Sequence, residues 1–190
     1  MVIYAIIRKC NYVFYKLCRR NSKKIKANTA NLLTLVNLGL GGFAILYTIN
    51  DVLNLSLLLI FLAALADRFD GMVARKFNIE SELGKQLDSM SDIISFGVAP
   101  ALLLYKGILF ELGAPGAFFI VLYIGCGAFR LARFNISDNC GFFNGLPITA
   151  AGCILTLSYL WKDFMPASNY IFLLMILSFC MIASFKVKKM

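Results

Sequence analysis

The stretch "DRFDGMVARKFNIESELGKQLDSMSD" (67–92) lies between two apolar runs, "VLNLSLLLIFLAALA" (52–66) and "IISFGVAPALLLY" (93–105). Four aspartates and two arginines therefore stand where two hydrophobic segments reach an aqueous boundary. Ionisable side chains are costly next to lipid, and when they occur in membrane segments they usually serve a function. The charged residues of this stretch and the apolar runs on either side of it predict both the fold and the function of the chain.

The chain as a whole has the composition of a membrane protein. Hydrophobic residues make up 60% of its 190 residues and its mean hydropathy is +0.77, whereas soluble domains contain about 45–50% apolar residues. Because backbone polar groups must be satisfied inside lipid, and a spanning helix needs about 20 apolar residues, a helical bundle is expected. We predict an all-α integral membrane protein with six transmembrane helices, of which the fifth is short: 29–50, 52–74, 84–106, 115–134, 146–161 and 168–185.

The distribution of basic residues predicts the orientation of these helices. If the N-terminus is cytoplasmic, all of the 19 lysines and arginines except Lys106 and Lys162 fall on the cytoplasmic side. This is the asymmetry of the positive-inside rule. Both termini and the charged stretch at 67–92 are therefore expected to face the cytoplasm, in a multi-pass protein of the cytoplasmic membrane.

Residues 1–28 are predicted to form a separate, basic, amphipathic helix beside the membrane. Residues 1–26 contain eight basic and no acidic side chains. On a helical wheel, apolar residues such as Ile3 and Val13 fall opposite basic residues such as Arg8 and Lys16. Such a helix binds anionic membrane lipid and not nucleic acid; a basic tail that only sets topology is the alternative. Residues 29–190 form the six-helix membrane domain.

Cysteine and histidine limit the chemistry that the chain can perform. The six cysteines are dispersed without metal-site spacing, and histidine is absent. A Ser-His-Asp triad, an imidazole base and histidine-ligated zinc are thereby excluded. Acid–base and metal chemistry must come from carboxylates.

The four aspartates are predicted to gather between two antiparallel helices. The helical period places the polar and small residues of each helix on one face, and the connection between the helices is short. The residues concerned are Asp67, Asp70, Gly71, Ala74 and Arg75 on the first helix and Gly84, Asp88 and Asp92 on the second.

Carboxylates held this close together repel one another unless a cation neutralises them. Oxygen ligands suit Mg²⁺, Mn²⁺ or Ca²⁺, and two bridged ions form a clamp for displacement at phosphorus. Gly71, Ala74 and Gly84 leave room for a ligand, and Arg75 offers a planar fork to a phosphate. Ordinary ion pairs at the helix ends are the alternative explanation of these charges.

The spacing D-x2-D-G-x2-A-R-x8-G-x3-D-x3-D, which residues 67–92 meet at every fixed position, resembles the signature of the CDP-alcohol phosphotransferases. The resemblance implies a six-helix membrane enzyme, usually a homodimer, that displaces CMP from a CDP-linked lipid with an alcohol. It also implies two divalent ions per subunit, Mg²⁺ or Mn²⁺, bound by Asp67, Asp70, Asp88 and Asp92. Asp92 would take the proton of the attacking hydroxyl, and the CDP moiety would contact Gly71, Ala74, Arg75 and Gly84.

Three further segments are similar to the phosphatidylserine synthase branch of this family: "SFGVAP" (95–100), "FRLARFN" (129–135) and "FNGLP" (143–147). The substrates implied are CDP-diacylglycerol, or a related CDP-lipid, and L-serine. Arg130 and Arg133 are candidates for binding the serine carboxylate, because a guanidinium is its natural bidentate partner. They are otherwise helix-end anchors, or they bind the phosphate of glycerol 3-phosphate or inositol phosphate in a sister activity. Asn37, with Thr34, is a candidate for the nucleotide pocket.

A divalent-cation channel or transporter is the alternative from another functional class, since stacked carboxylates also line ion pathways. The aspartates gather at one membrane face instead of the midplane, and Arg75 and Arg130 would oppose the passage of cations. A phosphotransferase is therefore the better interpretation. The sequence leaves open whether the lipid tail is a diacyl ester or an archaeal ether.

Overall fold

The structure, a computed structural model, describes residues 31–77, 82–136, 142–183 and 186–188. The predicted amphipathic helix at 1–28 lies outside these residues. The first described helix is Asn31–Ile49. After it come α2 (Leu53–Phe77), α3 (Glu82–Asp92), the π-helix η1 (Ile93–Val98), α4 (Ala99–Gly107), the 3-10 helix η2 (Leu109–Leu112), α5 (Ala114–Ile136), α6 (Ile148–Ser158), the 3-10 helix η3 (Tyr159–Trp161) and α7 (Ala167–Ile182).

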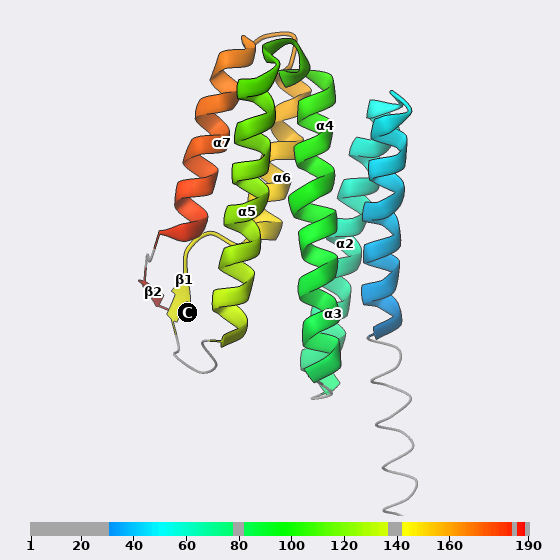
Figure 1. Ribbon diagram of the computed structural model, residues 1–190. Helices are drawn as coiled ribbons and strands as arrows, with labels where there is room; N and C mark the ends of the chain where they lie inside the picture. Colours follow the sequence, from blue (N-terminus) through cyan, green and yellow to red (C-terminus); the bar gives the residue numbers. More distant parts are fainter. Residues whose placement is uncertain (1–30, 78–81, 137–141, 184–185, 189–190) are drawn as a thin grey trace, which may run out of the picture.

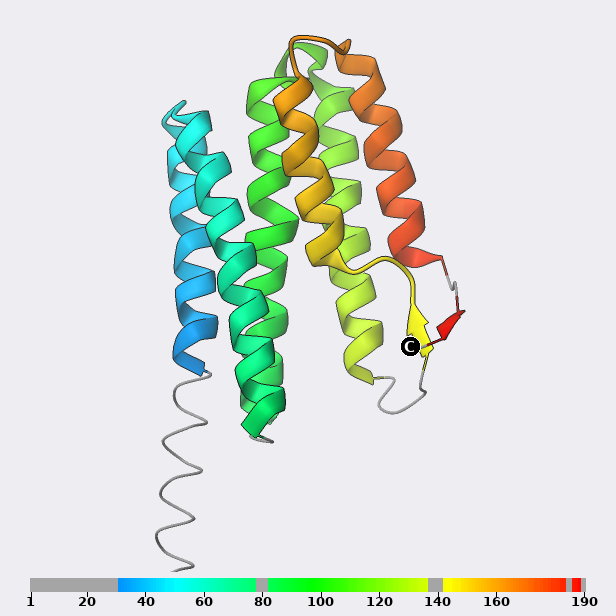
Figure 2. The same ribbon diagram turned by 180° about the vertical axis from the view of Figure 1, so that it is seen from behind.

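The described helices form one bundle, which confirms the all-α prediction. Because α3, η1 and α4 continue one another over Glu82–Gly107, six helical rods run up and down the molecule (Figure 1). The Asn31–Ile49 helix and α2 lie side by side at one edge, the α3–α4 rod is central, and α5, α6 and α7 complete the other side, as the view from behind also shows (Figure 2).

The six predicted spans correspond to these rods, but not all of the rods have the length and composition of a membrane span. Among the described residues, three helices are long and apolar enough to cross a membrane: Asn31–Ile49, Glu82–Gly107 and Ala114–Ile136. Ile148–Trp161 and Ala167–Ile182 are shorter apolar helices. Helix α2 is 25 residues long, and its second half carries the charged residues of the aspartate motif. The chain is thus a helical protein with several candidate spans, and the number six remains an expectation.

Apolar side chains divide between an interior and an outward surface. The interior contains Phe96, Leu103, Leu104, Tyr123, Leu155 and Leu174, all fully buried. Many large apolar side chains point outward instead, as expected for helices that lipid surrounds; examples are Leu35, Phe43, Leu58, Val121, Phe172 and Phe179.

Polar contacts hold the Asn31–Ile49 helix against the central rod. Ser91 Oγ donates to the Thr34 carbonyl oxygen over 3.3 Å, and Ser95 Oγ donates to the Asn37 carbonyl oxygen over 3.1 Å. A Cβ atom at Gly41 would overlap Ser95. The glycine therefore permits the close approach that these hydrogen bonds need.

The central rod widens into the π-helix η1 directly after Asp92. Pro100 has no N–H to donate to the carbonyl of Phe96, four residues earlier, so a regular helix cannot satisfy that oxygen. Tyr123 Oη on α5 donates to it instead, over 3.1 Å. A π-helical turn is rare and often marks a functional site; this one fixes the helix on which Asp92 stands.

The strands β1 (Phe142–Asn144) and β2 (Lys186–Lys188) pair antiparallel, with Phe143 opposite Val187. The connection that follows β1 is tied to the end of α7, where the Leu146 amide donates to the Cys180 carbonyl oxygen over 3.0 Å. Gly145, with a φ of 78°, makes the turn that directly follows β1. The "FNGLP" segment thus leads from β1 to the start of α6 and is tied to the end of α7.

Candidate metal centre

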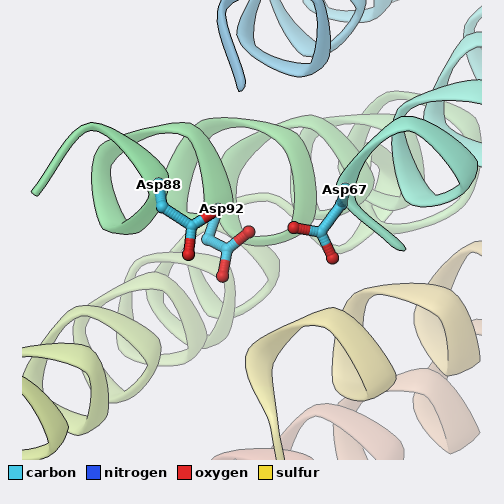
Figure 3. Close-up of side chains that lie close together, drawn as sticks. All are labelled: Asp67, Asp88 and Asp92. Atoms are coloured by element: carbon cyan, nitrogen blue, oxygen red, sulfur yellow. The ribbon is translucent and has the colours of Figure 1, made fainter. Parts of the chain in front are cut away.

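The aspartates of α2 and α3 meet, as the helical spacing predicts. A carboxylate oxygen of Asp67, one of Asp88 and one of Asp92 all lie within 4.8 Å of one another. Asp88 and Asp92 project from the same face of α3, and Asp67 points toward them from α2 (Figure 3). The positions i and i+4 stack on a helix, which is why a motif with this spacing brings two carboxylates to one point.

This cluster has the properties of a cation site. Asp92 is buried, with 9% of its surface exposed, and Asp67 and Asp88 are half-buried. Two carboxylates about 5 Å apart repel by about 3 kcal/mol at an effective dielectric constant of about 20. Three oxygen donors at this spacing match the ligands that hard divalent cations prefer. The donor set therefore fits Mg²⁺ or Mn²⁺.

The other residues of the motif are only partly described. Gly71 lies on α2 one turn beyond Asp67, and Gly84 lies on α3 one turn before Asp88; both are half-buried. Asp70, Ala74 and Arg75 belong to the last three turns of α2, which continues to Phe77. Their side chains lie outside what the structure describes, so their predicted roles stay predictions.

The two candidate arginines of α5 have different surroundings. Arg130 is buried, at 9% exposed, and lies close enough to Asp92 to interact with it electrostatically. Its Nε atom is buried without a hydrogen-bond partner among the described residues. Arg133 is exposed, and its Nη1 donates to the Ile182 carbonyl oxygen of α7 over 3.5 Å. Arg130 is therefore the more buried of the pair, and it lies beside Asp92.

Asn37 lies in the interior between the first described helix and the central rod. Its side chain is fully buried, and within the described chain neither Nδ2 nor Oδ1 of the side-chain amide has a hydrogen-bond partner. A buried amide without partners costs about 1–3 kcal/mol for each unsatisfied group. A buried amide that lowers stability this much is better explained by a bound ligand or water than by packing.

Three polar residues near the cluster were missed by the sequence-based predictions. Asn135, near the end of α5, donates through Nδ2 to Ser89 Oγ on α3 over 2.9 Å. Cys153 on α6 lies near enough to Asp67 to interact with it electrostatically. Asn135 belongs to the quoted segment "FRLARFN" and Ser89 follows Asp88, so position in the motifs was the available signal for these two. No sequence signal pointed to Cys153.

The neighbours of the cluster define the walls of the site. Arg130 of α5 lies near Asp92, and Cys153 of α6 lies near Asp67. Figure 3 shows the three carboxylates on the side of α2 and α3 that faces these two helices. A substrate that reaches the carboxylates would therefore lie between α2 and α3 on one side and α5 and α6 on the other.

Comparison with known proteins agrees with this geometry. The sequence profile described as CDP-alcohol phosphatidyltransferase matches residues 27–185. A Bacillus subtilis protein named CDP-diacylglycerol–serine O-phosphatidyltransferase is 37% identical over 138 residues, which cover 72% of this chain and 78% of the relative. An archaetidylserine synthase of Methanothermobacter thermautotrophicus is 38% identical over 175 residues, or 86% of this chain and 72% of the relative.

A Methanocaldococcus jannaschii protein named CDP-diacylglycerol–serine O-phosphatidyltransferase is 44% identical over 126 residues, which cover 66% of this chain and 57% of the relative. The match of the profile extends from before the first described helix to the end of α7, so it includes the whole described bundle and its carboxylate cluster. The chain belongs to the CDP-alcohol phosphatidyltransferase family.

Proposed function

We propose that the protein is a CDP-diacylglycerol–serine O-phosphatidyltransferase. The L-serine hydroxyl oxygen attacks the lipid-linked phosphorus of the CDP-lipid, and the bond from that phosphorus to the oxygen of CMP breaks. The products are a phosphatidylserine and CMP. The observation that carries this proposal is the cluster of Asp67, Asp88 and Asp92, in a chain whose similar relatives are named for serine.

The names of the relatives support serine more strongly than they support a particular lipid. The Bacillus protein is named for CDP-diacylglycerol and serine, whereas the Methanothermobacter protein is named for archaetidylserine. Serine is common to both names, and the lipid differs. We therefore assign serine as the acceptor and leave the lipid tail as either a diacyl ester or an archaeal ether.

Asp67, Asp70, Asp88 and Asp92 would hold two divalent ions, Mg²⁺ or Mn²⁺. When bound, such ions neutralise the pyrophosphate and stabilise the leaving CMP, which is the main source of catalysis in transfers of this type. The clustering of three of these carboxylates supports the assignment. The carboxylates contribute by holding the ions and the pyrophosphate oxygens in one place.

We assign Asp92 as the base that accepts the proton of the attacking hydroxyl. It is the most buried aspartate of the cluster, and Arg130 lies beside it. A base in this position can accept the proton only if the acceptor hydroxyl comes within hydrogen-bonding reach of its carboxylate. The acceptor would then enter from the α5 side, where Arg130 is placed to bind its carboxylate.

The nucleotide would occupy the opposite part of the site. Gly71, Ala74, Arg75 and Gly84 are assigned to the CDP moiety through the family motif. The side-chain amide of Asn37, which is buried and has no hydrogen-bond partner among the described residues, supports its assignment to the same pocket. A cytosine edge offers both a donor and an acceptor to such an amide.

We further propose that the protein acts as a homodimer, with both termini and the carboxylates on the cytoplasmic side of the membrane. The family supports the dimer, and the distribution of basic residues supports the orientation.

The purified protein tests the proposed function directly. CMP release is measured with CDP-diacylglycerol, L-serine and Mg²⁺ in mixed micelles, and phosphatidylserine is identified as the second product. Reactions without serine, or with glycerol 3-phosphate or inositol in its place, are the controls. If glycerol 3-phosphate proves the better acceptor, the assignment of serine is wrong and a sister activity replaces it.

A further inference from the structure

Asn135 connects the end of α5 to the helix that carries two of the clustered aspartates. Its Nδ2 donates to Ser89 Oγ over 2.9 Å, and Ser89 Oγ donates in turn to the Lys85 carbonyl oxygen over 3.0 Å. Ser89 directly follows Asp88 in α3. The contact therefore holds the amide of Asn135 against α3, at the residue that follows Asp88 in the chain.

This chain of hydrogen bonds fixes which end of the amide faces Ser89. A hydroxyl group has a single hydrogen to donate, and that of Ser89 is used on the Lys85 carbonyl oxygen. Ser89 Oγ can therefore only accept from Asn135, so the amide must present its nitrogen. The Asn135 carbonyl oxygen, Oδ1, then points away from Ser89.

Oδ1 of Asn135 is an acceptor without a visible use. The atom is buried, and in the part of the chain that the structure describes it has no hydrogen-bond partner. Leaving a buried acceptor unsatisfied is unfavourable, and most such groups in native proteins have a partner. A donor that arrives with the substrate would satisfy it.

L-serine, the proposed acceptor substrate, brings such a hydrogen-bond donor. L-serine carries a carboxylate, which the donors of Arg130 suit, and an ammonium, which needs an acceptor oxygen. Arg130 and Asn135 are five residues apart on α5, about 7.5 Å along the helix axis and about 140° around it. They flank the side of α5 that meets α3, where Arg130 lies near Asp92 and Asn135 donates to Ser89, one turn earlier. An uncharged hydrogen-bond acceptor such as the Asn135 amide oxygen suits this position, because a further carboxylate would compete with the clustered aspartates for the divalent ions.

We propose, on the basis of the proposed function, that Asn135 selects an amino-acid acceptor by receiving a hydrogen bond from its ammonium at Oδ1, in the orientation that Ser89 imposes on the amide. Asn135 is then a specificity-determining residue, and Ser89 is a positioning residue that acts through it. The recognised chemistry is an α-amino acid with a hydroxyl group, in contrast to a hydroxy acid or a phosphorylated alcohol.

The test compares serine with 3-hydroxypropanoate, which is serine without its amino group. The KM for serine is measured by CMP release at saturating CDP-diacylglycerol, and 3-hydroxypropanoate is measured as a competitive inhibitor against serine. In Asn135→Leu we expect the serine KM to rise about 10- to 100-fold, as for the loss of a hydrogen bond to a charged group. The inhibition constant of 3-hydroxypropanoate should stay within about threefold of wild type.

Two variants control for a purely structural role of the contact between α3 and α5. Asn135→Gln keeps both the donor and the acceptor of the amide and should retain more of the preference for serine over 3-hydroxypropanoate than Asn135→Leu does. Ser89→Ala leaves the amide free to turn and should raise the serine KM by less than Asn135→Leu does. In all three variants the KM for the CDP-lipid is expected to stay at its wild-type value.

The proposal is overturned if Asn135→Leu weakens serine and 3-hydroxypropanoate equally, because Asn135 would then only hold the helices together. An unchanged serine KM in Asn135→Leu would overturn it as well. Both results leave the serine transferase assignment intact. Wild-type protein that releases no CMP with serine would instead refute the proposed function, and with it this assignment.

Discussion

At the scale of single residues, the site depends on a few charged and amide groups whose surroundings differ sharply. Asp92 is buried beside Arg130, while Arg133, three residues further along α5, is exposed and hydrogen-bonded to α7. Residue types alone do not separate these roles. Each can be tested by a substitution that has a matched control elsewhere in the chain.

Replacing the clustered aspartates should abolish the transfer reaction. We expect Asp67→Asn, Asp88→Asn and Asp92→Asn each to lower CMP release at least about 100-fold at saturating Mg²⁺, because each removes a charged ligand or the base without changing shape. CMP release in micelles is the measurement.

Asp51→Asn is the matched control for these variants. Asp51 lies just before the start of α2, whereas Asp67 of the cluster is in its second half; Asp51 is exposed and pairs with Lys106 over 3.2 Å. Near-native turnover is expected. Near-native turnover by a cluster variant would show that the aspartate concerned has no role in the reaction.

The two arginines of α5 should respond differently to truncation. Neutralising a buried partner of a charged ligand typically costs about 2–5 kcal/mol, so Arg130→Ala should raise the serine KM about 30-fold or more, with the KM for the CDP-lipid nearly unchanged. Arg133→Ala should change the serine KM less than about threefold. A serine titration at saturating CDP-lipid distinguishes the two. Equal effects at both positions would refute the assignment of Arg130 as the specific carboxylate ligand.

At the scale of the elements, the π-helix η1 is the joint on which the site depends. It follows Asp92 directly, Tyr123 of α5 satisfies its Phe96 carbonyl oxygen, and Gly152 of α6 packs against the backbone of Phe96. Three helices thus meet at one non-standard turn. Its shape was not predicted from the sequence, because contacts from α5 and α6 stabilise it.

Crowding this joint should destabilise the bundle. A Cβ atom at Gly152 would lie 2.6 Å from the Phe96 carbonyl oxygen, whereas a Cβ at Gly125 on α5 would meet nothing within 4 Å. Overpacking costs about 1–3 kcal/mol, so Gly152→Ala should lower the Tm in detergent, and Gly125→Ala should leave it unchanged or raise it slightly. Similar Tm values for the two variants would mean that α6 does not pack tightly on η1.

At the scale of the whole molecule, the carboxylate cluster joins two separate helices, so its occupation should stabilise the fold. A ligand that binds only the folded state raises stability by mass action. We expect Mg²⁺ or Mn²⁺ to raise the Tm of the wild-type protein and to restore the activity that EDTA removes. Asp88→Asn should show a smaller rise in Tm. Full activity after thorough chelation would be incompatible with metal-assisted transfer.

The orientation of the bundle is the second whole-molecule prediction. In a cysteine-free variant, a single cysteine at Gln86, near the carboxylate cluster, should react with a membrane-impermeant maleimide only when the cytoplasmic face is exposed. A cysteine at Asp163, in the connection between α6 and α7 at the other end of the bundle, should react from the opposite face. Labelling of both from one side would contradict the predicted topology.

The sequence by itself determined the helical class, the approximate limits of the helices and the meeting of Asp67 with Asp88 and Asp92. These follow from composition and from the period of a helix, which are local properties. The predicted 52–74 and 84–106 became Leu53–Phe77 and Glu82–Gly107, because charged residues extend a helix beyond its apolar run. The motif also sufficed to indicate the family.

Only the tertiary structure decided which side chains share the site with the aspartates. The burial of Arg130 but not Arg133, the burial of Asn37 and the bond from Asn135 to Ser89 all depend on how α5 and the first described helix are rotated against the central rod. A helical wheel gives the relative directions of residues on one helix but not the direction in which that helix faces its neighbours. That rotation is fixed by packing between residues distant in sequence, such as Ser95 against Gly41 and Tyr123 against Phe96.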